Sequence, residues 1–175
     1  MTGELLPSAL LEPIGGGPGV SLREGRGPRA VVALHPLPCD ACVRYARRLA
    51  GAADRLEEWD ARILVVVPVT GSGDPPVAPG PRVQVLSDAP GDLAAGEAHV
   101  SVADEWGEVY FSTDAGAGHA FPSPDELLEW IQFIAIQCPE CEGPEGEWRT
   151  LMGVSRPPRS RTGDAAARRG RGPAA

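Results

Sequence analysis

Residues 29–67 decide the fold, and they read RAVVALHPLPCDACVRYARRLAGAADRLEEWDARILVVV. Residues 29–34 and 62–67 are short apolar runs that each begin with one arginine, and the second is nearly all β-branched residues or leucine, which is typical of buried strands. Between them, residues 40–59 carry apolar side chains at spacings of three and four, which predicts a helix with one apolar face. Two strands joined through a helix lie parallel in one sheet, with a right-handed crossover between them.

The rest of the pattern adds strands and a second helix to this unit. Short strands are expected at residues 20–22 and 82–86, and a hairpin at residues 98–112. Ser123 suits the N-cap of a helix that runs to residue 137, because Pro124 then occupies the first helical position. The sequence therefore predicts an α/β fold with a mixed β-sheet sandwiched by helices.

The composition divides the chain into three parts. We expect a flexible lead-in at residues 1–17, which end in a glycine-rich run, and one domain at residues 18–150. Residues 151–175 contain six arginines and have no large apolar side chain beyond residue 154, which predicts a disordered basic tail.

Charge and hydropathy exclude several classes of partner. Residues 1–155 carry ten arginines against 23 acidic residues, so we expect no nucleic acid on the folded domain. No apolar run approaches the roughly 18 residues of a membrane span, and the N-terminus lacks the basic segment of a signal peptide. These features predict a cytoplasmic protein, in which cysteines serve catalysis or metal binding more often than structural disulfides.

All four cysteines lie in CxxC pairs. Cys39 and Cys42 follow a predicted strand and open a predicted helix, which is the arrangement of a redox dithiol. The unpaired N–H groups and the positive end of the helix dipole favour the thiolate of Cys39, and Cys42 is near enough to close a disulfide. The neighbouring carboxylate of Asp40 works against that thiolate. Half of a zinc site and a buried structural pair are the alternatives.

Cys138 and Cys141 form the second pair, in the segment CPEC after the last helix. A helix of about 13 residues spans about 19 Å, so this pair is expected more than about 15 Å from Cys39 and Cys42. One zinc ion bound by all four thiolates in one chain is therefore not expected. A second redox or regulatory dithiol, a zinc site between two molecules and a buried structural turn remain open for this pair.

The three histidines, His35, His99 and His119, are all expected at the end of the sheet that carries Cys39. Any of them could act as a base for a cysteine. Two of them with both thiolates would form a Cys2His2 metal site.

Three segments resemble redoxin domains of the thioredoxin-like superfamily. They are VSLREGRGPRAVVALHPLPCDACVRYARRL, the LSD element in VQVLSDAPGDLA, and the D-x-x-G-x-V hairpin in VSVADEWGEVYFS. The resemblance covers about residues 18–136 and implies a thioredoxin-like fold with a redox-active Cys39–Cys42 pair.

The sequence departs from that superfamily in two places. Thioredoxin-like oxidoreductases usually have a cis-proline just before the hairpin, and Ala98 stands at that position. The peroxiredoxin motif P-x-x-x-T-x-x-C fails, because His35 replaces its proline and Cys39 its threonine. Peroxidase activity is therefore not assigned.

The leading interpretation is a thiol–disulfide oxidoreductase that acts on protein thiols or disulfides and needs no metal or cofactor. Cys39 is its attacking thiolate and Cys42 its resolving thiol. His35, His99, His119, Cys138 and Cys141 are possible accessory residues. The alternatives are a non-catalytic interaction protein or complex subunit on the same fold, and a Cys/His protein that binds zinc or copper.

Overall fold

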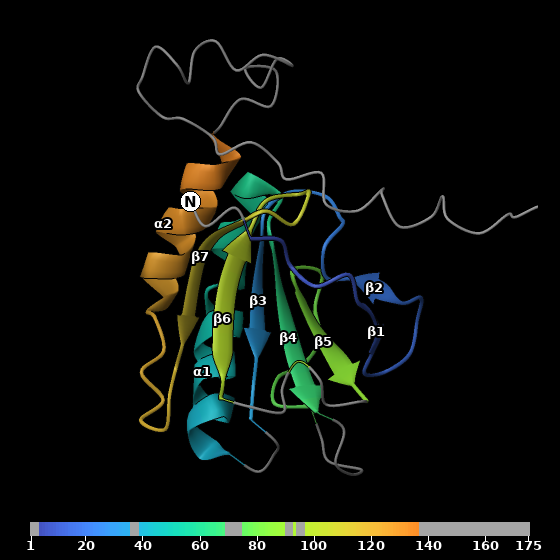
Figure 1. Cartoon of the computed structure of the whole chain (residues 1–175), viewed down its shortest axis with the longest axis vertical. Helices are drawn as coiled ribbons and strands as arrows, with labels where there is room; N and C mark the ends of the chain where they lie inside the picture. Colours follow the sequence, from blue (N-terminus) through green and yellow to red (C-terminus); the bar gives the residue numbers. More distant parts are fainter. Residues whose placement is uncertain (1–3, 36–38, 69–74, 90–92, 94–96, 137–175) are drawn as a thin grey trace, which may run out of the picture. The chain divides into compact units, whose positions relative to one another are not determined.

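The structure is a computed structural model that describes residues 4–35, 39–68, 75–89, 93 and 97–136. The described residues form one mixed sheet with the strand order β2-β1-β5-β4-β3-β6-β7 (Figure 1). Its strands are β1 (Leu10–Pro13), β2 (Val20–Ser21), β3 (Arg29–Ala33), β4 (Arg62–Pro68), β5 (Val83–Asp88), β6 (His99–Ala103) and β7 (Val109–Asp114). The helices are α1 (Asp40–Gly51), the 3-10 helix η1 (Ala53–Trp59) and α2 (Pro124–Ala135).

The strand–helix–strand unit predicted from residues 29–67 is confirmed. β3 and β4 pair in parallel from Arg29↔Arg62 to Ala33↔Val66. β6 pairs antiparallel with the other side of β3, and β6 and β7 form the expected hairpin. The α/β class and the mixed sheet are thus confirmed.

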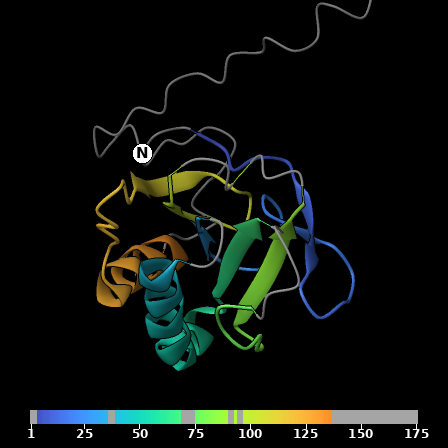
Figure 2. The ribbon, with the colours of Figure 1, turned by 90° about the horizontal axis from the view of Figure 1, so that it is seen from below.

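The pleat of β3 sends alternate side chains into two apolar clusters, one on each face of the sheet. Val32 contributes to the cluster under α1, η1 and α2, which all pack on the same face (Figure 2). Val31 contributes to the opposite cluster, which includes Leu6, Leu11 and Leu22 of the N-terminal segment. Among the described residues this segment covers the second face, which the sequence analysis expected helices to cover.

Strand β1 corrects the prediction of a flexible lead-in at residues 1–17. Leu11 lies in β1, and both Leu6 and Leu11 are buried. β1 pairs antiparallel with β5, so burial of two leucines and edge pairing of the backbone order a segment that is rich in proline and glycine.

The helix expected over residues 40–59 is two segments, since α1 ends at Gly51 and a 3-10 helix follows. Glycine is less favourable than alanine inside a helix by about 1 kcal/mol, which explains an end at this residue. At the second helix, Ser123 is the N-cap, and its side chain accepts a hydrogen bond from the N–H of Glu126, as predicted. None of the helices in the described ranges has the length and apolar character of a membrane span.

Four chain segments meet at one end of the sheet. Ala33 at the end of β3 lies opposite His99 at the start of β6. α1 begins seven residues after β3 ends, and β7 runs back to the same end, where Asp114 pairs with His99. The loop after β7 therefore lies beside the first turn of α1.

Candidate dithiol site

Cys39 and Cys42 lie at the N-terminus of α1. Cys39 is the N-cap residue, with an extended backbone, and its side chain caps no helix N–H. Its carbonyl accepts a hydrogen bond from Val43, which begins the helix. Cys39 is partly exposed, whereas Cys42 in the first turn is fully buried. Both are free thiols, and only Cys39 is open to another molecule.

The two sulfurs differ in their chemistry as well as in their exposure. Burial is the main cause that raises the pKa of the Cys42 thiol, to about 11 in total; a hydrogen bond involving His35 lowers the pKa, and the neighbouring Cys39 raises it. At neutral pH Cys42 is therefore a protonated thiol inside the domain.

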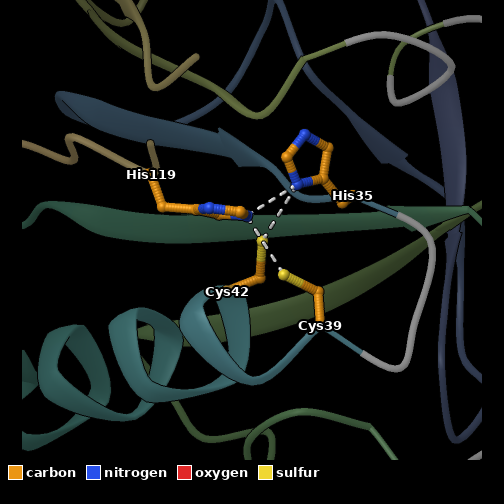
Figure 3. Close-up of side chains that lie close together, drawn as sticks. All are labelled: His35, Cys39, Cys42 and His119. Carbon is orange, nitrogen blue, oxygen red and sulfur yellow. Dashed lines mark hydrogen bonds between the residues drawn. The ribbon is translucent and has the colours of Figure 1, made fainter. Parts of the chain in front are cut away.

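His119 contacts the accessible sulfur, with 3.2 Å between its Nε2 and Sγ of Cys39 (Figure 3). The loop after β7 holds His119 at a φ of +53°, a conformation that is uncommon for residues other than glycine. The N–H of His119 donates to the carbonyl of Gly116, and its ring packs beside Phe121. An uncommon backbone conformation held by a closed turn is typical of residues at functional sites.

His35 follows β3, and its ring meets His119 edge to face. Its Nδ1 lies 3.0 Å from Nε2 of His119 and 3.7 Å from Sγ of Cys42. On the other side of the ring, the backbone N–H of Ala98 donates to Nε2 over 3.1 Å. An atom that accepts a hydrogen bond carries no proton, so the neutral ring has its proton on Nδ1.

This assignment separates the roles of the two histidines. His35 is a donor toward the cluster, because its lone pair faces Ala98. Nε2 of His119 lies between that donor and Cys39, so it is the nitrogen that can accept a proton from the accessible thiol. Each of the four side chains contributes one nitrogen or sulfur atom to the cluster, and these four atoms all lie within 4.8 Å of one another. The residues are His35, Cys39, Cys42 and His119.

His99 is not part of this cluster, although it lies at the same end of the sheet. Its Nδ1 is 2.6 Å from a carboxylate oxygen of Asp114, and its Nε2 lies within hydrogen-bonding distance of Ser101 and Ser112. Cys138 and Cys141 lie outside the described residues. The separation of more than about 15 Å between the two cysteine pairs therefore stays a prediction.

The hydrogen bond of the Ala98 N–H does not follow from the sequence pattern, which indicates only that alanine replaces the usual proline at this position. Proline has no backbone N–H, whereas alanine has one. The replacement of proline by alanine was therefore the one sign in the sequence that this position can donate a hydrogen bond. The acceptor, Nε2 of His35, could not be predicted from local sequence, because His35 and Ala98 are 63 positions apart.

Comparisons with known proteins identify the fold. No family model and no curated protein matches the sequence. Among solved structures, peroxiredoxin Q of Xanthomonas campestris matches with a TM-score of 0.59 and 17% identity, over 75% of this chain and 97% of that one. The thioredoxin lipoprotein Etrx1 of Streptococcus pneumoniae matches with a TM-score of 0.54 and 15% identity, over 71% and 98%. The peroxidoxin BcpB of Mycobacterium tuberculosis matches with a TM-score of 0.55 and 19% identity, over 78% and 98%. The described part of the chain therefore has a thioredoxin-like fold, similar to that of these thioredoxin and peroxiredoxin structures.

Proposed function

We propose that the protein is a cytoplasmic thiol–disulfide oxidoreductase that uses Cys39 and Cys42. The observation that carries the proposal is the unequal pair at the start of α1. Cys39 is partly exposed and has Nε2 of His119 at 3.2 Å, whereas Cys42 is fully buried one turn later. In disulfide exchange, one sulfur has to be accessible to the substrate so that it can attack the substrate disulfide. The second sulfur attacks the first from within the protein and needs no contact with the substrate.

The reaction begins at Cys39, whose thiol proton passes to Nε2 of His119. The Cys39 thiolate attacks one sulfur of a substrate disulfide, the S–S bond breaks, and the leaving thiolate takes up a proton. Cys42 then loses its proton and attacks Sγ of Cys39, which releases the second substrate thiol. The substrate disulfide gains two electrons, and the protein keeps a Cys39–Cys42 disulfide.

A dithiol reductant, either a small molecule or another protein, restores the reduced state through the same steps in reverse. Protein disulfides are the proposed substrates, because Cys39 is partly exposed at the N-terminus of α1, where another molecule can reach its sulfur. The proposal does not extend to peroxides, since His35 and Cys39 replace the proline and threonine of the peroxiredoxin motif.

Reduction of insulin disulfides by dithiothreitol, with the full chain as catalyst, tests this function. Wild-type protein should accelerate the reaction, and Cys39→Ser should abolish the acceleration. A Cys138→Ser/Cys141→Ser double variant is the matched control and should retain it. Catalysis that survives Cys39→Ser, or that disappears only in the double variant, would place the activity at the second pair. No acceleration by wild type would favour a non-catalytic interaction protein.

A further inference from the structure

We propose that the reduced site also binds one Zn²⁺ ion and that zinc and disulfide exchange exclude each other. The ligands are Sγ of Cys39 and Cys42, Nδ1 of His35 and Nε2 of His119. Zinc binding is a property of the four side chains and does not depend on the proposed function. Only the mutual exclusion rests on that function.

Three of the distances between the four atoms are close to the edges of a tetrahedron around zinc. Zinc bonds of about 2.0–2.1 Å to nitrogen and about 2.3 Å to sulfur give tetrahedral edges of about 3.3–3.8 Å. The two imidazole nitrogens are 3.0 Å apart, the Cys39–His119 pair is at 3.2 Å and the Cys42–His35 pair at 3.7 Å. No two of the four atoms are more than 4.8 Å apart, so small side-chain rotations would bring all of them to one ion.

The donor set and its burial favour zinc in a closed site. Two thiolates and two imidazoles are a common set for structural zinc, which binds four protein ligands and no water. Cys42 is fully buried and the other three residues are partly buried, so a bound ion would be largely screened from solvent by the protein. Binding releases the two thiol protons to solvent and changes no oxidation state, and the two thiolates balance the charge of the ion.

The hydrogen bond from the Ala98 N–H makes zinc binding by Nδ1 of His35 less favourable. Nδ1 of His35 binds zinc only when its proton has moved to Nε2, and Nε2 then stops accepting from the Ala98 N–H. Zinc binding therefore carries its own signature, which is the loss of this hydrogen bond. The reduced protein without metal keeps it.

The same two sulfurs serve both processes. Coordination to zinc lowers the nucleophilicity of a thiolate toward a disulfide, and sulfurs joined in a Cys39–Cys42 disulfide no longer offer two thiolates to zinc. Zinc would thus hold the reduced protein inactive, and oxidation would release the metal.

Zinc titration of the reduced, metal-free full chain, in competition with a chromophoric chelator, tests the proposal. The Cys138→Ser/Cys141→Ser background removes the second CxxC pair, which could itself bind metal. We expect one ion per chain in this background, and cobalt in place of zinc should give the intense visible bands of a tetrahedral sulfur-ligated ion. His35→Asn and His119→Asn should each weaken zinc binding by more than about 100-fold, beyond the 10–100-fold typical of outer-shell partners.

His99→Asn is the matched control, because its side chain lies outside the cluster, and it should leave zinc affinity unchanged. In nitrogen NMR of labelled protein, the coupling across the Ala98–His35 hydrogen bond should disappear when zinc is added. Zinc that binds the wild type but not the double-serine background would overturn the proposal. So would unchanged affinity in His35→Asn, or an Ala98–His35 coupling that survives saturation with zinc. All three measurements are independent of catalysis. They therefore test zinc binding even if the protein does not catalyse disulfide exchange.

Discussion

The backbone N–H of Ala98 donates a hydrogen bond to Nε2 of His35 over 3.1 Å, and this contact fixes which ring nitrogen carries the proton. Ala98 is buried and lies one residue before β6, so the donor is held rigidly by the sheet. With Nε2 occupied, His35 presents Nδ1–H to His119 and Cys42. A backbone group thereby assigns the roles of proton donor and proton acceptor to two neighbouring histidines.

Removing this N–H should slow disulfide exchange and raise the affinity for zinc. Ala98→Pro removes the donor, so His35 is no longer confined to one tautomer and disulfide exchange slows. Zinc affinity rises, because the wild type leaves a buried N–H without an acceptor when zinc binds, at a cost of about 1–3 kcal/mol. We expect about tenfold tighter zinc binding, since about 1.4 kcal/mol corresponds to that factor.

Ala98→Gly is the control, as it keeps the N–H and removes one methyl group. Chelator competition gives the zinc affinity, and far-UV circular dichroism verifies that both variants are folded. Equal zinc affinity in folded Ala98→Pro and Ala98→Gly proteins would contradict the role assigned to this hydrogen bond.

His119→Asn should slow the reaction of Cys39 with a disulfide by about a hundredfold, within the range of a lost general base. Asparagine can contact the thiol but does not take up its proton at neutral pH. Stopped-flow measurement with a chromogenic aromatic disulfide gives the rate, and His99→Asn serves as the control with a rate close to wild type. A rate in His119→Asn that matches this control would show that another group accepts the proton.

Tyr45→Phe should raise the free energy of unfolding by about 1 kcal/mol. Tyr45 is fully buried, and its hydroxyl has no hydrogen-bond partner among the described residues. A buried hydroxyl without a partner costs about 1–3 kcal/mol in mutational data. Phenylalanine removes that cost and keeps the stacking on Phe121, whose ring lies 4.1 Å away at an angle of 7°.

Tyr45→Leu provides the comparison, because it removes the hydroxyl and the stacking together and should be less stable than Tyr45→Phe. Urea denaturation measures both variants. Destabilisation of Tyr45→Phe by 1 kcal/mol or more (about a fivefold change in the folding equilibrium) would mean that the hydroxyl is hydrogen-bonded.

Ser123→Ala should lower the free energy of unfolding by about 1 kcal/mol, the typical effect of removing an N-cap. The Ser123 side chain accepts from the N–H of Glu126 over 3.1 Å, and alanine leaves that N–H without this partner. Ser123→Asn should remain close to wild type, because its side-chain oxygen can accept the same bond. Equal losses in both variants, measured by urea denaturation, would show that the cap is not what stabilises the start of α2.

The sequence predicted those parts of the fold that have a strong local pattern. β3 and β4 are continuous apolar runs, and the helix between them requires parallel pairing, so the centre of the sheet followed from a single segment. β1 has no such pattern, since its pairing with β5 joins residues more than 70 positions apart. The N-cap at Ser123 could be predicted, because capping depends only on neighbouring residues.

The candidate site was predictable in its cysteines and only partly in its histidines. Strand order brought His35, His99 and His119 to one end of the sheet, but it did not define the side-chain direction. His99 pairs with Ala33 and hydrogen-bonds with Ser101, which places its ring on the face opposite Cys42. Successive residues of a strand point to opposite faces, so a shift of one residue decides whether a side chain reaches the site.

Trapping the intermediate in Cys42→Ser, and locating the mixed disulfide by peptide mass spectrometry, tests whether Cys39 attacks a substrate disulfide and Cys42 resolves the product. We expect a glutathione or peptide disulfide to accumulate on Cys39 in this variant, whereas the wild type should release it and show a Cys39–Cys42 disulfide. A mixed disulfide found on Cys138 or Cys141, or none on Cys39, would show that Cys39 is not the attacking thiol.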